Sequence, residues 1–139
     1  MELKIIIQIL ESSIQDPSQG LPEELFLFVS RMTPLINVDL LIKNEQNQTL
    51  LTWRDDEYYA TGWHIPGGIV RYKETFADRI NAVAKNELGI KVTFNEIPLT
   101  IKEGFNHNCK NRGHFISFLY QCTLITQPNI DWKYKGNTP

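Results

Sequence analysis

Cysteine, histidine and excess positive charge are all scarce in this chain of 139 residues. The two cysteines, Cys109 and Cys122, provide neither a disulfide framework nor the spacing of a zinc finger. The chain has 14 lysines and arginines against 16 aspartates and glutamates, so its net charge is −2 and no basic surplus is available for a nucleic-acid backbone. We therefore expect no nucleic-acid partner and a reducing, cytoplasmic environment.

Long apolar runs are missing as well. The isoleucines at 5–7 are followed by Gln8 and Glu11, so this run is too short for a secretory signal or a membrane span. We expect no membrane partner, and we interpret the run as part of a first helix or strand that packs on the body of the protein. The hydrophobic fraction of 42% is typical of globular proteins, and the length predicts a single domain over residues 1–139.

Residues 1–32 are predicted to form a mainly helical N-terminal extension of this domain. A cluster of helix-breaking residues at 16–20 divides the extension into two parts. Pro22 and the two glutamates that follow it are favourable in the first turn of a helix, and Pro34 stops that helix.

The following segments are predicted to be strands. Residues 35–43 have the apolar character of a largely buried strand, and turn-forming residues connect them to a second strand at 49–53, so the two are predicted to form a hairpin. Two further strands are predicted at about 90–103, with an interruption at Pro98, and at 114–125.

The strongest helical pattern covers residues 73–88. Its apolar residues recur at the spacing of one helix face, and Gly89 is placed to end the helix. Strands on both sides of a helix predict an α+β (mixed α/β) fold.

A spaced pattern of glycine and glutamate crosses residues 62–90. Five residues separate Gly68 from Glu74, and Glu87, Gly89 and Ile90 follow at fixed distances. This segment resembles the signature of the Nudix hydrolases, which is glycine, five residues, glutamate, seven residues, and then Arg-Glu-apolar-x-Glu-Glu-x-Gly-apolar. The chain departs from it at three positions, where an arginine and two glutamates are replaced by Ala82, Val83 and Asn86. The resemblance implies the Nudix fold, with a mixed sheet sandwiched between helices.

The replaced glutamates bear on metal binding. Positions 83, 86 and 87 lie three and four residues apart, so side chains there project from one side of a helix. Glutamates at all three positions would hold hard divalent ions, which prefer oxygen ligands. Only Glu87 remains here, so we expect one Mg²⁺ rather than a multi-metal site.

Loss of those carboxylates is a feature of one Nudix branch, the GDP-mannose mannosyl hydrolases. The chain resembles this branch over about residues 23–125. The matching elements are, in order, Arg31-Met32-Thr33-Pro34-Leu35, Val38-Asp39, Leu50-Leu51, Arg54, Gly62-x-x-x-Pro66-Gly67-Gly68 and Glu87-Leu88-Gly89. The resemblance implies that water attacks carbon C1 of a nucleotide sugar and that GDP leaves with inversion, whereas most Nudix enzymes attack phosphorus.

The resemblance also implies roles for individual residues. By position, Glu87 and the carbonyl of Gly67 would be Mg²⁺ ligands. Arg54 would neutralise charge on the diphosphate, a task that suits its planar and permanently charged guanidinium. Asp39 would contact the sugar or stabilise the positive charge that develops near C1.

Two further substrate-binding residues follow from the same resemblance. Phe26 falls where the branch has an aromatic residue near the nucleobase, and His114 resembles a histidine at the start of the matching strand. The branch takes its general base and a third metal ligand from a late loop, which a C-terminal helix follows. This chain stops at Pro139, before such a loop, which indicates a shortened chain or a truncated relative. One hypothesis is that His107 or His114 replaces the missing base.

Two cations of the branch are also missing. Ile69 and Ala82 stand where the branch has arginines that are directed at phosphate. The cations that would be available to compensate are Lys73, Lys85, Lys110 and Arg112.

These observations predict a Mg²⁺-dependent hydrolase of a nucleoside diphosphate sugar, most like GDP-mannose. One alternative is a pyrophosphatase that attacks phosphorus, and another is a binding module whose catalytic site has decayed. Members of the resembling branch are dimers with N-terminal elements at the interface, and the N-terminal helix carries much apolar surface. We therefore expect a homodimer.

Overall fold

The computed structural model describes residues 1–55, 61–129 and 131. The end of the chain whose truncation was considered above lies outside these residues. No helix in the described ranges combines the length and apolar character needed to cross a membrane.

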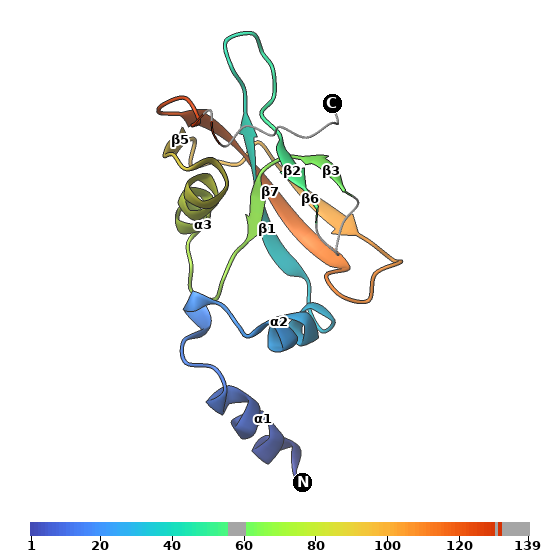
Figure 1. The fold of residues 1–139 in the computed structure, drawn as a ribbon. Coiled ribbons are helices and arrows are strands. Elements are labelled where there is room, and N and C mark those ends of the chain that lie inside the picture. The colour runs from blue at the N-terminus through green and yellow to red at the C-terminus, as the bar shows by residue number, and fades with distance from the viewer. Residues whose placement is uncertain (56–60, 130, 132–139) are drawn as a thin grey trace.

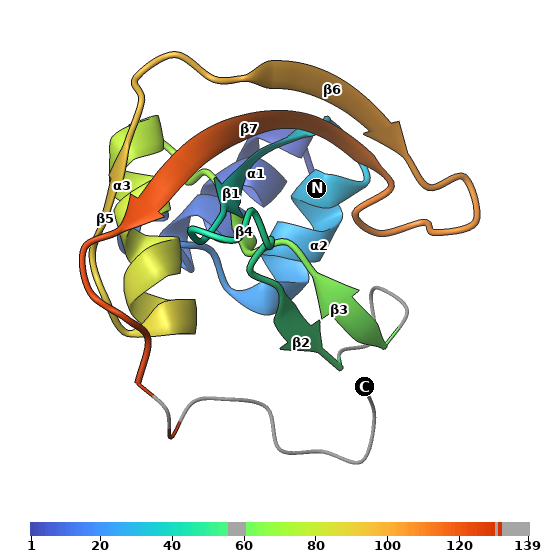
Figure 2. The ribbon, with the colours of Figure 1, turned by 90° about the horizontal axis from the view of Figure 1, so that it is seen from above.

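A five-stranded mixed sheet forms the centre of the protein (Figure 1). Strands β4 (Gly67–Ile69), β1 (Leu35–Ile42), β7 (His114–Leu124) and β5 (Val92–Phe94) follow one another in that order, and β6 (Thr100–Phe105) also pairs with β7. The β1–β7 pair is parallel, and the other pairs are antiparallel. In Figure 2 the curved β7 separates β6 from β1. The predicted α+β fold with a mixed sheet is confirmed.

Strand β1 divides its side chains between an apolar core and a polar surface. Val38, Leu40 and Ile42 are buried in the main hydrophobic cluster, which also contains residues of helix α3 (Phe76–Val83). Because successive side chains of a strand point to opposite faces, Asp39 lies on the face away from α3. The sheet therefore carries a core on one face and polar groups on the other.

The predicted hairpin between 35–43 and 49–53 forms at its turn, but its second arm does not continue along β1. Lys43 forms an isolated bridge with Thr49, and the amide of Leu50 donates a 2.8 Å hydrogen bond to the carbonyl of Ile42. Residues beyond the turn leave the sheet, and β2 (Thr52–Arg54) pairs with β3 (Gly62–His64) in a separate two-stranded sheet. The physical reason is that β1 already has β4 on one side and β7 on the other.

The predicted helix at 73–88 begins later and changes type. Lys73 has a left-handed backbone with φ of 60°, and the helix begins at Phe76 after a capping box in which Thr75 and Asp78 exchange hydrogen bonds. Residues Ala84–Leu88 form a π-helical turn, which Gly89 ends with φ of 71°. Turns of this kind occur often at functional sites.

The predicted packing of the N-terminus on the body is wrong. Helix α1 (Leu3–Ser12) buries no residue, and Ile6 and Ile7 keep 40% and 44% of their surface exposed. A short 3-10 turn (Pro17–Gln19), capped by the side chain of Asp16, separates α1 from α2 (Glu23–Ser30). Helix α1 therefore extends away from the sheet, as Figure 1 shows.

Candidate active site

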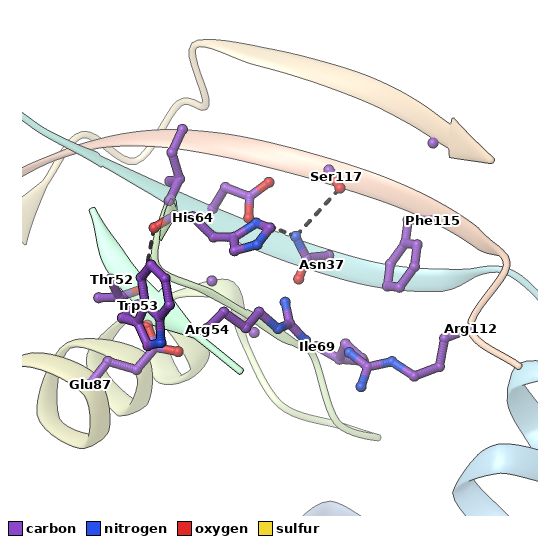
Figure 3. Close-up of a pocket in the computed structure, with 15 residues that line it drawn as sticks. Asn37, Thr52, Trp53, Arg54, His64, Ile69, Glu87, Arg112, Phe115 and Ser117 are labelled. Carbon is purple, nitrogen blue, oxygen red and sulfur yellow. Dashed lines mark hydrogen bonds between the residues drawn. The ribbon is translucent and has the colours of Figure 1, made fainter. Parts of the chain in front are cut away.

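A cavity of about 660 Å³ lies on the polar face of the sheet. Side chains reach it from β1, the β2–β3 sheet, the glycine-rich β4, the end of the π-helical turn and the segment that leads into β7. Figure 3 shows these side chains converging from separate parts of the chain. Segments far apart in sequence thus form one pocket.

Four of the six predicted site residues line this cavity: Asp39, Arg54, Gly67 and Glu87. The other two, Phe26 and His114, are not among its lining residues. The ring of Phe26 lies below the guanidinium of Arg112, with 5.8 Å from the carbon Cζ to the ring centroid. His114 stacks on Phe105 at 4.4 Å between ring centroids. Phe26 thus supports a lining residue, and His114 belongs to an aromatic stack beside the pocket.

Asp39 is held between its own strand and β4. The side-chain amide of Asn37 donates a hydrogen bond of 2.9 Å to Asp39 Oδ1. Burial raises the pKa of Asp39, and the bond from Asn37 opposes that rise. Gly67 faces Asp39 across the strand pair, and a Cβ atom at Gly67 would collide with Asp39 Oδ1 and would lie 2.7 Å from the carbonyl oxygen of Val38. The absence of a side chain at Gly67 therefore makes room for the carboxylate.

Glu87 reaches the same pocket from the π-helical turn. Although the residue as a whole is exposed, burial of its carboxyl group raises the pKa of Glu87 to about 7. The guanidinium of Arg54 and the amide of Gly67 lower this pKa, while the charge of Asp39 raises it. Glu87 and Asp39 are thus two carboxylates that are close enough to repel each other.

This donor set fits a single hard cation. Val83 is buried in the core and Asn86 carries no charge, so Glu87 is the one carboxylate that the three box positions offer to the pocket. Within the described ranges, no group of three histidine, cysteine, aspartate or glutamate side chains is arranged as a metal site. Glu87 and the carbonyl oxygen of Gly67 could hold one divalent ion, with water completing its shell.

Glu74, the first glutamate of the box, has a structural position. Its Oε1 and Oε2 accept hydrogen bonds of 2.7 and 2.8 Å from Nε and Nη2 of Arg79, and the amide of Arg71 also donates to Oε1. The ion pair is largely buried, with 11% of the Glu74 side chain and 10% of the Arg79 side chain exposed. Hydrogen bonding to Arg79 is the largest cause of the lowered pKa of Glu74.

Two charged or titratable lining residues, Arg112 and His64, are not among the six predicted site residues. Of the four cations considered as replacements, Arg112 lines the cavity, and the three lysines are not among its lining residues. His64 is the histidine among the described lining residues, so the hypothesis that placed a base at His107 or His114 receives no support from their positions. His107 and His114 both stack on Phe105 instead.

Comparison with known proteins identifies the family. Residues 33–136 match the profile of the NUDIX domain. The chain belongs to the Nudix family. It is 32% identical over 112 residues to the low-salt glycan biosynthesis protein Agl8 of Haloferax volcanii, a match that covers 78% of this chain and 70% of that protein.

Solved structures show the same fold at lower identity. A MutT NUDIX hydrolase from Burkholderia pseudomallei is 21% identical with a TM-score of 0.61, and the match covers 70% of this chain and 73% of that one. A NUDIX hydrolase from Nitrosomonas europaea is 16% identical with a TM-score of 0.60, and the match covers 74% of this chain and 66% of that one. This Nudix chain therefore places its candidate pocket on a fold that hydrolases of the family share.

Proposed function

We propose that this Nudix protein is a Mg²⁺-dependent hydrolase of a nucleoside diphosphate sugar, most like GDP-mannose, that cleaves the bond at the anomeric carbon. The observation that carries the proposal is the composition of the pocket: one helix-end carboxylate, a second carboxylate on the sheet, and arginines beside them. In addition, Agl8, the relative with 32% identity, is named for glycan biosynthesis, which supports a sugar-containing substrate.

The pocket residues suit a displacement at carbon. Water forms a bond to C1 of the sugar while the bond from C1 to the diphosphate oxygen breaks, and the electron pair leaves with GDP. Asp39 would stabilise the positive charge that develops at the sugar, and Arg54 would stabilise the negative charge on the departing diphosphate. Glu87 and the Gly67 carbonyl would hold Mg²⁺, which lowers the cost of charge on the leaving group when it is bound.

The attacking water must lose a proton. His64 lines the pocket, and an imidazole is the usual proton acceptor near neutral pH. We assign the general base to His64 in this proposal. The proton then passes from water to the His64 ring as the new C–O bond forms.

Attack at phosphorus would need additional carboxylates at the end of helix α3 and in the π-helical turn. Enzymes of that kind use several carboxylates to bind metal and activate water. Here Val83 turns into the hydrophobic core and Asn86 has no acidic group, which favours the reaction at carbon.

Product analysis in ¹⁸O-labelled water tests the proposal. The substrates are GDP-mannose, ADP-ribose and a nucleoside triphosphate, each with and without Mg²⁺, and the products are followed by ³¹P NMR and mass spectrometry. We expect unlabelled GDP and sugar that carries ¹⁸O. Nucleoside monophosphate with ¹⁸O on phosphorus would show that the protein is a pyrophosphatase instead. Binding without turnover would indicate a nucleotide-sugar binding module.

We also propose that α1 joins two copies of the chain. Leu3, Ile6 and Leu10 recur every three or four residues, so they form an apolar stripe without any buried residue in α1. Lys4 lies near one end of the helix and Glu11 near the other, so an antiparallel pair about a two-fold axis would bring opposite charges together.

Light scattering over a dilution series tests this contact. Ile6→Lys introduces a charge into the stripe and is expected to give a monomer, whereas Gln8→Lys on the polar side of the same helix is expected to leave the dimer intact. A wild-type mass of one chain at all concentrations would contradict the proposal.

A further inference from the structure

Arg112 is held in place by the loop between β6 and β7. Its backbone adopts a left-handed conformation with φ of 54°, which is uncommon for a residue with a side chain. The amide of Arg112 donates a 3.0 Å hydrogen bond to Oγ of the buried Ser30 at the end of α2. On the neighbouring residue, Asn111 Oδ1 accepts a 2.7 Å bond from Nη1 of Arg31.

The loop itself is closed tightly around this position. The amide of Asn106 donates to the carbonyl of Gly113 at 2.8 Å. A Cβ atom at Gly113 would lie 2.7 Å from the carbonyl oxygen of Cys109, so the residue after Arg112 has space for hydrogen alone. The backbone of Arg112 is thus fixed both by α2 and by its own loop.

The side chain of Arg112 is directed from this loop into the pocket. It lies over the ring of Phe26, which offers a cation–π contact at 5.8 Å. Figure 3 shows the side chains of Arg54 and Arg112 extending toward each other over the position of Ile69. The guanidinium groups of Arg54 and Arg112 therefore lie on either side of Ile69, the position where the resembling branch has an arginine.

We propose that Arg112 and Arg54 together form a phosphate-binding subsite, in which Arg112 supplies the positive charge that Ile69 lacks. This inference rests on the proposed function, since it names the groups that would hold the diphosphate of the substrate. The ligand chemistry is a phosphate or diphosphate oxyanion, which matches the planar fork of a guanidinium. In this proposal Phe26 is a positioning residue that acts through its contact with Arg112.

The subsite also determines how a bound diphosphate would be oriented in the pocket. The carboxylates Asp39 and Glu87 interact electrostatically with each other, and Arg54 lies within range of Glu87. Arg112 comes from the separate β6–β7 loop and lies on the side of Arg54 that is farther from Glu87 (Figure 3). A diphosphate bound between the arginines would therefore place one end toward Glu87.

Calorimetric titration with inorganic pyrophosphate in EDTA tests the subsite directly. The proteins are wild type, Arg112→Gln, and Lys110→Gln as a control, because Lys110 is a cation of the same loop that is not among the lining residues. We expect Arg112→Gln to weaken binding about ten- to hundredfold, as for loss of a charge-assisted hydrogen bond, while Lys110→Gln stays within about twofold of wild type. Phe26→Leu is expected to weaken binding less than Arg112→Gln.

The outcomes separate this inference from the proposed reaction. Equal pyrophosphate affinity in wild type and Arg112→Gln would overturn the subsite, and so would the absence of binding to wild type. If Arg112→Gln fails to fold, as judged by circular dichroism, Arg112→Lys keeps the charge but loses the fork and is compared in its place. Since the titration involves no turnover, a loss confined to the Arg112 variants supports the subsite even where no nucleotide sugar is hydrolysed.

Discussion

Glu74 and Arg79 form a bidentate ion pair beneath the glycine-rich strand, with oxygen–nitrogen distances of 2.7 and 2.8 Å. The aliphatic part of Arg79 also packs below β4, because a Cβ atom at Gly68 would lie 3.1 Å from Arg79 Cδ. The pair therefore joins the start of α3 to the strand that carries Gly67. It supports the pocket from below without facing a ligand.

Breaking this ion pair should destabilise the fold. Glu74→Gln leaves the buried guanidinium of Arg79 without its charge partner, and we expect a loss of about 3 kcal/mol in the free energy of unfolding. Glu96→Gln, at an exposed position, should change the free energy by less than about 0.5 kcal/mol. Urea denaturation at neutral pH measures both values.

The same pair predicts a dependence of stability on acid. The pKa of Glu74 in the folded protein lies below its ordinary value of 4.5, so the stabilisation is fully present above 4.5 and is lost as the pH falls through the folded value. The difference between wild type and Glu74→Gln should therefore shrink below pH 4.5. A difference that stays constant from neutral pH into acid would show that the carboxylate charge contributes nothing.

Gly67 should not tolerate a side chain. Gly67→Ala places a methyl group against Asp39 and the carbonyl of Val38, both of which belong to the central strand. We expect a destabilisation of about 1–3 kcal/mol, together with a loss of activity because Asp39 must move. Gly104→Ala is the control for stability, since its Cβ would meet Phe115 at an ordinary distance of 3.8 Å.

Much of the pocket could be predicted from the spacing of residues in the sequence. The distances among Gly68, Glu74 and Glu87 identified the family, and four predicted site residues line one cavity. The strand that contains Asp39 was predicted with nearly its observed bounds, because the short run is rich in branched apolar residues and begins just after Pro34.

The parts that were predicted wrongly depend on long-range contacts. The segment at 49–53 has the local character of a strand, but its partner is set by β4 and β7, which already occupy both sides of β1. Arg112 gains its place from Ser30 and Phe26, residues more than 80 positions away, and no local pattern indicates that contact. Helix α1 is amphipathic in sequence, but the pattern does not identify the surface that covers it.

Mg²⁺ binding should require Glu87 and should depend on pH. The metal binds the ionised carboxylate, and the pKa of Glu87 without metal is about 7, so the apparent affinity should rise roughly tenfold per pH unit below 7 and level off above it. Glu87→Gln should weaken Mg²⁺ binding by about tenfold or more. Titration calorimetry of wild type and Glu87→Gln from pH 5.5 to 8.5 measures both effects. A Mg²⁺ affinity of wild type that does not change with pH would contradict the assignment of Glu87 as a ligand.

In the absence of metal, Glu87→Gln should stabilise the folded protein, although it weakens Mg²⁺ binding. The pKa of Glu87 is raised from 4.5 to about 7, so the folded state becomes less stable as the pH rises through that interval. Removing the ionisable group removes this cost, and Glu87→Gln should melt at a higher temperature than wild type above pH 7 in EDTA. A lower melting temperature would show that Glu87 is a structural residue instead.

His64 should control the rate rather than the binding of substrate. If His64 accepts the proton of the attacking water, His64→Gln should lower kcat by about 10²- to 10⁴-fold, with little change in KM. His107→Gln removes a histidine of the Phe105 stack and should retain wild-type kcat, which separates loss of the base from loss of a histidine in general. Equal rates for wild type and His64→Gln would move the base to another group.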